Sequence, residues 1–139
     1  MSKCMIASPL LLLLLVLVIG CGPNHQKLTG TVTFSDDGSP LTVGVVVMQS
    51  EKGDARGTID ANGNFVMGFT SEKDGIPKGV TYKVTIVNAV EEMGRSRSGT
   101  PAMGPLIDLK YMDPNTSGFT FTSDGKTKTM DLKVDRFRQ

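Results

Sequence analysis

The sequence predicts an all-β protein: an antiparallel, Greek-key-like β-sandwich of about seven strands that follows the first twenty residues. Two observations point to strands. Apolar and polar residues alternate along five segments after residue 27, and a sixth segment is a continuous apolar run. Asp-Gly and Asn-Gly pairs, which favour tight turns, lie between these segments. A third observation argues against helices, because no segment after residue 20 carries a sustained helical stripe.

The first strand is expected over residues 28–34, because every second residue there is a threonine and the residues between the threonines are Leu28, Gly30, Val32 and Phe34. Residues 43–48 form the continuous run, which is typical of a central strand covered on both faces. The remaining strands are indicated by sets of residues that share one face: Phe65, Met67 and Phe69; Val80, Tyr82, Val84 and Ile86; Phe119 and Phe121; Met130, Leu132 and Val134.

Turn residues separate the predicted strands. Gly38 and Pro40 end the first strand, and the Asn62-Gly63 pair predicts a hairpin between Ile59 and Phe65. Residues 123–126 predict a similar turn before the last strand. Residues 91–105 have little periodicity, so we expect a long surface loop, and such loops are either functional or disordered.

Composition limits the classes of function. The chain has 139 residues, which favours one domain, and it carries 15 basic and 14 acidic side chains. The net charge of +1 gives no electrostatic basis for binding nucleic acid, which needs a clustered basic excess. We therefore expect no nucleic-acid partner.

The N-terminal segment has the pattern of a secretory signal. Lys3 precedes an unbroken apolar run over residues 10–19, which is about half the length that a membrane-spanning helix needs. The following residues, 18–21 (VIGC), resemble the lipobox of bacterial lipoproteins. The resemblance implies that Cys21 receives a diacylglycerol group and that the chain is cut between Gly20 and Cys21. The alternative is an uncleaved anchor with an incidental cysteine.

These features define the expected organisation: a signal peptide over residues 1–20, a lipid-anchored tether over 21–27, and a sandwich domain over 28–135. Cys4 lies in the removed segment, so Cys21 would be the last cysteine and no intrachain disulfide could form. Acyl chains on Cys21 would hold the protein at a membrane. The expected location is the extracytoplasmic bacterial envelope, at the outer membrane or the periplasmic face.

The body of the chain contains a series of strand and turn motifs. In order, they are LTGTVTF at 28–34, DGSPL at 37–41, GTID at 57–60, NGNF at 62–65, DGIPKG at 74–79, YKVTI at 82–86, KY at 110–111 and TSGFT at 116–120. Together they resemble the small transthyretin-like, or carboxypeptidase regulatory-like, β-sandwich domains of bacterial lipoproteins, over most of residues 27–135. The chain departs from the family in the step from Gly79 to Tyr82, which is three residues rather than two, and in Asp108-Leu109, where the family often has proline. The resemblance implies an accessory, structural or binding module without a cofactor.

Residues for catalysis or metal binding are scarce, and we expect neither an enzyme nor a metal site. His25 is the single histidine and falls in the expected tether, outside the domain, so we expect neither a histidine-based triad nor a zinc site. Residues 60–64 superficially suggest a calcium loop, but glycine stands at position four rather than six. The eight methionines could hint at copper, although those that follow the strand pattern are better explained as core residues.

Three residues are candidates for ligand contact: Arg95, Arg97 and Tyr111. The two arginines could meet anionic lipid or polysaccharide, or they could belong to a solvated loop balanced by Glu91 and Glu92. Tyr111 could be an exposed platform for sugar or a core aromatic residue. The predicted function is a non-catalytic, membrane-anchored structural or protein-interaction module with envelope proteins or glycan as partners. The alternative is an accessory module that binds carbohydrate or another ligand through residues 91–105.

Overall fold

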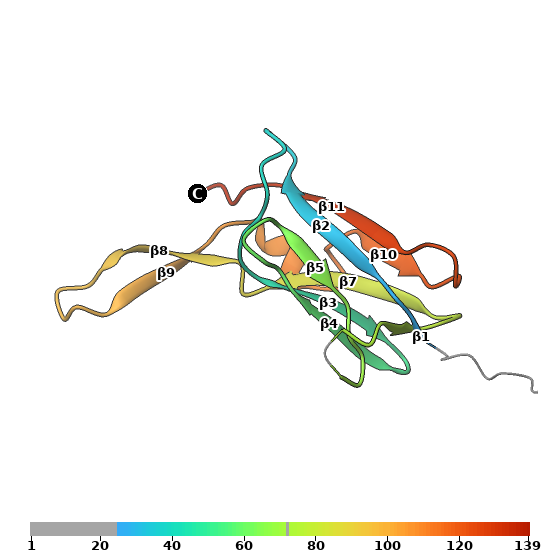
Figure 1. The fold of residues 1–139 in the computed structure, drawn as a ribbon. Coiled ribbons are helices and arrows are strands. Elements are labelled where there is room, and N and C mark those ends of the chain that lie inside the picture. The colour runs from blue at the N-terminus through green and yellow to red at the C-terminus, as the bar shows by residue number, and fades with distance from the viewer. Residues whose placement is uncertain (1–24, 72) are drawn as a thin grey trace, which may run out of the picture.

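The computed structural model describes residues 25–71 and 73–139, which fold as an all-β sandwich (Figure 1). One sheet has four strands in the order β10-β7-β3-β4, and the other has three in the order β11-β2-β5, which confirms the predicted number of seven. The strands of the first sheet are β3 (Val45–Ser50), β4 (Gly53–Thr58), β7 (Thr81–Val87) and β10 (Phe119–Thr122). Those of the second are β2 (Thr29–Phe34), β5 (Asn64–Val66) and β11 (Thr129–Val134).

Four further strands and one turn of helix lie outside the two sheets. Strands β1 (His25–Gln26) and β6 (Ile76–Pro77) pair at one end of the sandwich, and β8 (Val90–Arg95) and β9 (Pro101–Pro105) pair as a separate hairpin. The 3₁₀ helix η1 (Leu109–Met112) follows β9. Within the described residues, no helix is long and apolar enough to cross a membrane.

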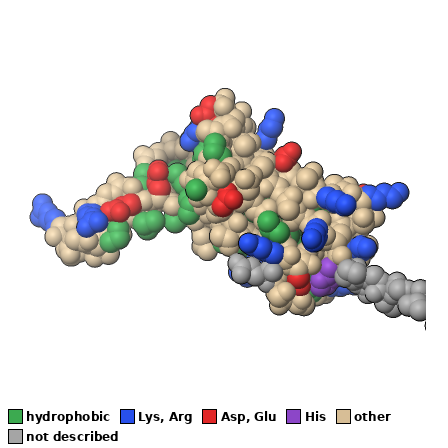
Figure 2. Space-filling model, in the orientation of Figure 1, with side chains coloured by type: hydrophobic (Ala, Val, Ile, Leu, Met, Phe, Trp, Pro, Cys, Tyr) green, Lys and Arg blue, Asp and Glu red, His purple; other side chains and the backbone are tan. Residues whose placement is uncertain are grey.

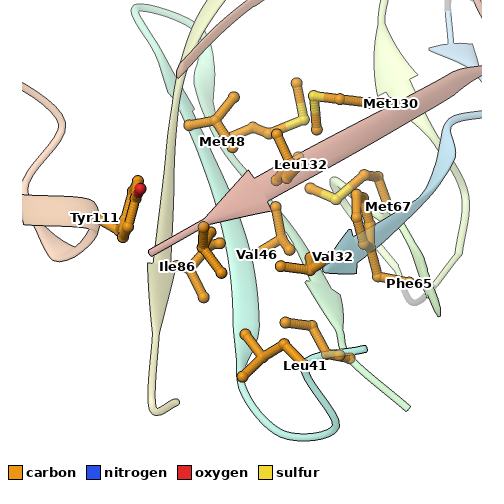
Figure 3. Close-up of a cluster of buried hydrophobic side chains, with 14 of the residues drawn as sticks. Val32, Leu41, Val46, Met48, Phe65, Met67, Ile86, Tyr111, Met130 and Leu132 are labelled. Carbon is orange, nitrogen blue, oxygen red and sulfur yellow. The ribbon is translucent and has the colours of Figure 1, made fainter. Parts of the chain in front are cut away.

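The apolar faces predicted by alternation form the core between the two sheets. Figure 3 shows Val32 and Leu132 from the three-stranded sheet meeting Val46 and Met48 from the four-stranded sheet. All four side chains are buried; the intervening residues of β2 and β11 are polar and lie on the opposite face, whereas the intervening residue of β3, Val47, is also buried. Burial of this kind supplies the main favourable free energy of folding. The threonines of β2 are on the opposite face, as expected.

A close contact between β2 and β5 explains why glycine stands inside the first strand. A Cβ atom on Gly30 would lie 2.0 Å from the Met130 carbonyl oxygen and 2.4 Å from the Phe65 ring. Phe65 is 2% exposed, so its ring fills the space that a side chain on β2 would otherwise occupy. The missing side chain therefore allows the aromatic residue to enter the core.

One expectation about strand pairing was wrong. Strands β2 and β11 are parallel, whereas an antiparallel sandwich was expected. The predicted turn at Gly63 forms, with a backbone hydrogen bond of 2.9 Å between Asp60 and Asn64, and Arg56 and Gly68 make an antiparallel bridge in the same register, although β4 and β5 then belong to different sheets. Alternation has the same period in parallel and antiparallel strands, and a tight turn does not decide which neighbour a strand will pair with.

The run at residues 43–48 also starts later as a strand than expected. Gly44 has a φ of 131°, a conformation that side chains disfavour, and β3 begins only at Val45. Val43 is therefore exposed. The prediction of a central strand is confirmed, because β3 lies between β4 and β7.

The folded region is longer at both ends than the expected domain of residues 28–135. Gln26, assigned above to the tether, is buried in β1; its side chain donates to the Thr127 carbonyl and accepts from the Gly125 N–H. At the other end, Arg136 binds Asp36 at 2.8 Å and covers the Phe34 ring at 3.7 Å. Residues 21–24 of the expected tether lie outside the described residues.

We predict that Gly30→Val lowers the free energy of unfolding by about 1–3 kcal/mol, because the new side chain collides with Phe65 and the Met130 backbone. Chemical denaturation measures the change. Thr29→Val on the exposed face is the matched control and should change stability by no more than about 0.5 kcal/mol. Equal stability of the Gly30→Val variant and the wild type would contradict the packing described here.

Candidate functional site

The most prominent surface feature is a β-hairpin that projects from the sandwich, called here the arm (residues 90–105; Figure 1). It corrects the expectation that residues 91–105 form a loop, because β8 and β9 pair antiparallel along this segment. The chain leaves the four-stranded sheet at Asn88, which has a φ of 58°, a left-handed conformation that asparagine tolerates. The arm is therefore a continuation of the chain of β7 beyond the end of its sheet.

Backbone hydrogen bonds define both ends of the arm. At its base, the Leu106 N–H donates to the Ala89 carbonyl at 2.9 Å. At its tip, the Ser96 N–H donates to the Thr100 carbonyl at 2.9 Å, and Gly99, with a φ of 81°, makes the turn. The register shifts between Glu92 and Gly94, which is a β-bulge.

The arm exposes apolar and charged side chains together. Met93 is 55% and Met103 58% exposed, which is unusual for large apolar residues. Glu92 and Arg95 form an exposed ion pair of 3.0 Å, and Arg97 is exposed near the tip. Figure 2 shows hydrophobic side chains along the arm, acidic ones beside them and basic ones toward its end. Methionine and arginine are both enriched at protein–protein interfaces.

The arm and β1 lie at opposite ends of the sandwich (Figure 1). Strand β1 pairs with β6, which precedes the start of β7, whereas β8 follows the end of β7. The seven residues of β7 span about 20 Å at ~3.3 Å per residue. The first described residues of the chain are therefore separated from the arm by the full length of the central sheet.

Tyr111 is a core residue, which corrects its candidacy as an exposed ligand contact. Its side chain is 4% exposed and its ring stacks on Phe119 with centroids 5.3 Å apart. Figure 3 shows it at the side of the buried cluster. Its hydroxyl donates to the Asp135 carboxylate at 3.2 Å and accepts from the Asp135 N–H at 3.0 Å. Tyr111 thus attaches η1 to the end of β11, and the structure does not bring it together with Arg95 and Arg97.

The carboxylates with the most strongly perturbed pKa values organise loops. Hydrogen bonds from Ser35, Lys110 and Tyr111 lower the pKa of Asp135 to about 2. Contacts with Ser39 and Arg136 lower the pKa of Asp37 to about 2, and the backbone and hydroxyl of the 126–127 turn do the same for Asp124. Hydrogen bonds from the Thr70 hydroxyl and neighbouring backbone groups also lower the pKa of Asp74. Each carboxylate is held ionised by structural hydrogen bonds, which Asp74 and Asp124 receive from their own loops and Asp37 and Asp135 partly from distant segments, and this makes each a poor general acid near neutral pH.

A shallow groove of about 490 Å³ lies between β4 and β5, where the two sheets separate. Its lining combines Asp54 and Asp60 with Arg56 and Lys73. The Asp60 carboxylate is already engaged by the N–H groups of Asn62 and Asn64. The groove is therefore a mixed polar surface without a concentrated charge of one sign.

His25 is placed in a structural role. Its ring meets Phe69 edge-on with centroids 5.8 Å apart, and Nδ1 lies 3.6 Å from the Asp74 carboxylate. Among the described residues, no cluster of three or more histidine, cysteine or acidic side chains could hold a metal ion. Gly20 and Cys21, the predicted cleavage and lipidation residues, lie outside the described residues.

Met93 and Met103, which are exposed on the arm, were not among the candidate residues predicted from the sequence. A signal existed, because Pro101, Met103 and Pro105 alternate with the small residues Ala102 and Gly104. Because prolines and glycines are uncommon in strands, the composition of residues 91–105 favoured a loop in spite of this alternation.

No family model matches the chain, and no curated protein matches it. Among solved structures, the major pilin subunit of Bacillus cereus is 16% identical over 82% of this chain and 30% of the pilin, with a TM-score of 0.48. A 9R-lipoxygenase from Cyanothece PCC8801 is 17% identical over 81% of this chain and 17% of the lipoxygenase, with a TM-score of 0.35. The chain thus spans less than a third of the length of either protein.

We predict that Asp135→Asn lowers stability at neutral pH and weakens its dependence on pH below about 4. The pKa of Asp135 falls from 3.8 to about 2 on folding, so its ionised form stabilises the fold above pH 3.8, and this contribution is lost as pH falls through about 2. Denaturation curves from pH 7 to pH 2 measure the effect. Asp54→Asn, on the exposed side of β4, is the control. An unchanged slope in the Asp135 variant would contradict this role.

Proposed function

We propose that this protein is a lipid-anchored, non-catalytic β-sandwich module of the bacterial envelope that contacts another protein through its arm. The observation that carries the proposal is the placement of β1 and the arm at opposite ends of the sandwich (Figure 1). A chain that approaches a membrane through β1 presents an exposed hairpin on the far side. The module would serve to hold that hairpin at a set height above the lipid.

The proposed anchor rests on the lipobox-like residues and the apolar run before them. Because β1 begins at His25, three residues separate Cys21 from it, and the four residue steps from Cys21 to His25 span at most about 14 Å. The β1 end of the sandwich would then face the membrane closely. Two or three acyl chains, at about 0.8 kcal/mol per buried CH₂, make such anchoring effectively permanent.

The proposed non-catalytic role is supported by the contacts of the carboxylates and of the histidine, which hold the fold together. The carboxylates with lowered pKa values are engaged by structural hydrogen bonds and ion pairs, and the single histidine contacts Phe69 and Asp74. The motif resemblance to transthyretin-like domains of bacterial lipoproteins supports the same conclusion, and we propose this finer assignment of the sandwich. Since folds of this kind serve many purposes, the arm is the better guide to function.

A protein partner is favoured over a carbohydrate by the chemistry of the arm. Sugar-binding surfaces commonly present an aromatic face, and residues 90–105 contain no aromatic residue. Tyr111, the aromatic candidate, is buried. The arm instead offers Met93, Met103 and Arg95, residue types that protein interfaces favour. Carbohydrate recognition by Arg95 and Arg97 remains the alternative function.

We expect Cys21→Ala to release the protein from membranes, and globomycin to accumulate its unprocessed precursor. In anchored wild type, a photo-crosslinker at Arg97 should capture protein, whereas one at Lys133, on the exposed face of β11, should capture about tenfold less or nothing. A glycan array compares wild type with an Arg95→Ala, Arg97→Ala double variant. Specific glycan signals lost in that variant, with no protein captured at Arg97, would favour the alternative. Unchanged membrane retention of the Cys21→Ala variant would contradict the anchor.

A further inference from the structure

The hydrogen-bond pattern of the arm reveals which backbone groups remain free. The Leu106 N–H bonds the Ala89 carbonyl, and opposed pairs in an antiparallel ladder alternate between bonded and non-bonded, so the next pair, Val90 and Pro105, is non-bonded. The same alternation makes Glu92 and Met103 a non-bonded pair. Residues in such pairs direct their N–H and carbonyl groups outward, away from the partner strand.

Beyond the bulge, the bonded and non-bonded pairs follow from the hydrogen bond at the tip of the arm. The Ser96 N–H bonds the Thr100 carbonyl, so the neighbouring pair of Arg95 and Pro101 is non-bonded. The outward positions are therefore Val90, Glu92 and Arg95 on β8, and Pro101, Met103 and Pro105 on β9.

The two edges of the arm differ in their ability to accept another strand. On β9, two of the three outward positions are proline, which has no N–H, so this edge is blocked against strand addition. On β8, all three outward positions have an N–H group. An exposed strand edge with free donors and acceptors is a template for pairing, so β8 is the edge on which a partner strand can add.

The charges of β8 are self-complementary. Glu91 and Glu92 form an acidic half, and Arg95 and Arg97 a basic half. If β8 pairs antiparallel with a second β8 about a twofold axis between residues 93 and 94, Glu92 of each copy lies opposite Arg95 of the other. Both residues occupy outward positions, as strand pairing requires. A twofold interface demands such self-complementarity.

The twofold axis between residues 93 and 94 also passes beside the bulge of β8 and the exposed side chain of Met93. The bulge adds one residue between the outward positions of Glu92 and Arg95, and in this register Met93 and Gly94 of one copy lie opposite Gly94 and Met93 of the other, so the two strands remain equal in length across the axis. Met93, more than half exposed in one chain, then lies beside the axis. The Glu92–Arg95 ion pair within one arm is solvent-exposed, so exchanging it for a pair between copies costs little.

We propose that the partner of the arm is a second copy of this chain, and that the two β8 strands pair antiparallel to form a four-stranded sheet in the order β9-β8-β8-β9. This inference rests on the proposed role of the arm as the contact element and names what it contacts. Four paired strands are also more stable than an isolated two-stranded hairpin. The dimer joins the sandwiches end to end, which places the two β1 ends at its far ends, so the two proposed anchors would insert into two facing membrane surfaces.

The test uses two differently tagged full-length copies expressed together and co-purified from detergent extracts. A basic variant, Glu91→Lys with Glu92→Lys, should lose co-purification with itself by at least about tenfold, because like charges then meet across the axis. An acidic variant, Arg95→Glu with Arg97→Glu, should lose it equally. Expressed together, the two variants should recover pairing to within about twofold of wild type, since opposite charges meet again.

Two controls separate edge pairing from misfolding. Glu51→Lys with Lys52→Glu, in the exposed turn between β3 and β4, changes charges away from the arm and should leave co-purification unchanged. Glu92→Pro removes an outward N–H that the arm does not use and should abolish pairing, whereas Met103→Pro on the blocked edge should preserve it.

Retention of pairing by both charge variants, or failure of the mixed variants to recover it, would overturn the dimer. In either case, capture of a different protein by the crosslinker at Arg97 would leave the proposed function standing. Absence of any protein captured at Arg97, with no pairing of wild-type copies, would reject both.

Discussion

The structure depends on the packing of β7 between β3 and β10 and against the opposite sheet. Tyr82, Val84 and Ile86 alternate along this strand and are completely buried. At its start, the Val80 N–H donates to the Ser123 hydroxyl, which donates in turn to the Pro77 carbonyl. At its end, the chain turns at Asn88 into the arm. One rigid strand therefore sets the separation between β1 and the arm, on which the proposed orientation depends.

Polar contacts complete the sandwich where apolar packing ends. The Asp135 carboxylate joins β2, η1 and β11 by accepting from Ser35, Lys110 and Tyr111. Arg136 then covers Phe34 and reaches Asp36 and Asp37. Because these ion pairs are partly exposed, they contribute less to stability than their number suggests and act mainly by fixing the chain end. The polar chemistry of the molecule is thus largely committed to its own loops and ends.

The sequence predicted the strand pattern well because alternation records burial directly. Residues such as Val84, Leu132 and Phe65 lie in the core where the pattern placed them. Pairing partners were harder to predict, since β2 and β11 are almost a hundred residues apart and their parallel direction leaves no mark on either strand. The sandwich was therefore recognisable, whereas its fully antiparallel form was not.

The candidate site was predictable only in part. Arg95 and Arg97 are exposed as expected, but the arm around them forms without the residues that favour strands. Its pairing depends on the backbone hydrogen bond between Leu106 and Ala89 at its base and on the turn at Gly99, which composition does not reveal. Tyr111 belongs to the core because Phe119 and Asp135 converge on it, a meeting of distant segments that local sequence cannot show.

The central claim is that one rigid body holds the β1 end and the tip of the arm apart. Pulsed electron–electron double resonance, which measures the distance between two spin labels, tests it most directly. Lys27 and Ser98, both exposed, would be changed to cysteine to carry the spin labels, and the chain's own two cysteines would be changed to alanine. The labelled protein is diluted with unlabelled protein, so that only distances within one chain are measured. The seven residues of β7 and six of β8, at ~3.3 Å each, predict a single narrow distance distribution beyond about 35 Å. A distribution centred below about 25 Å, or one spread broadly across the range, would contradict the account.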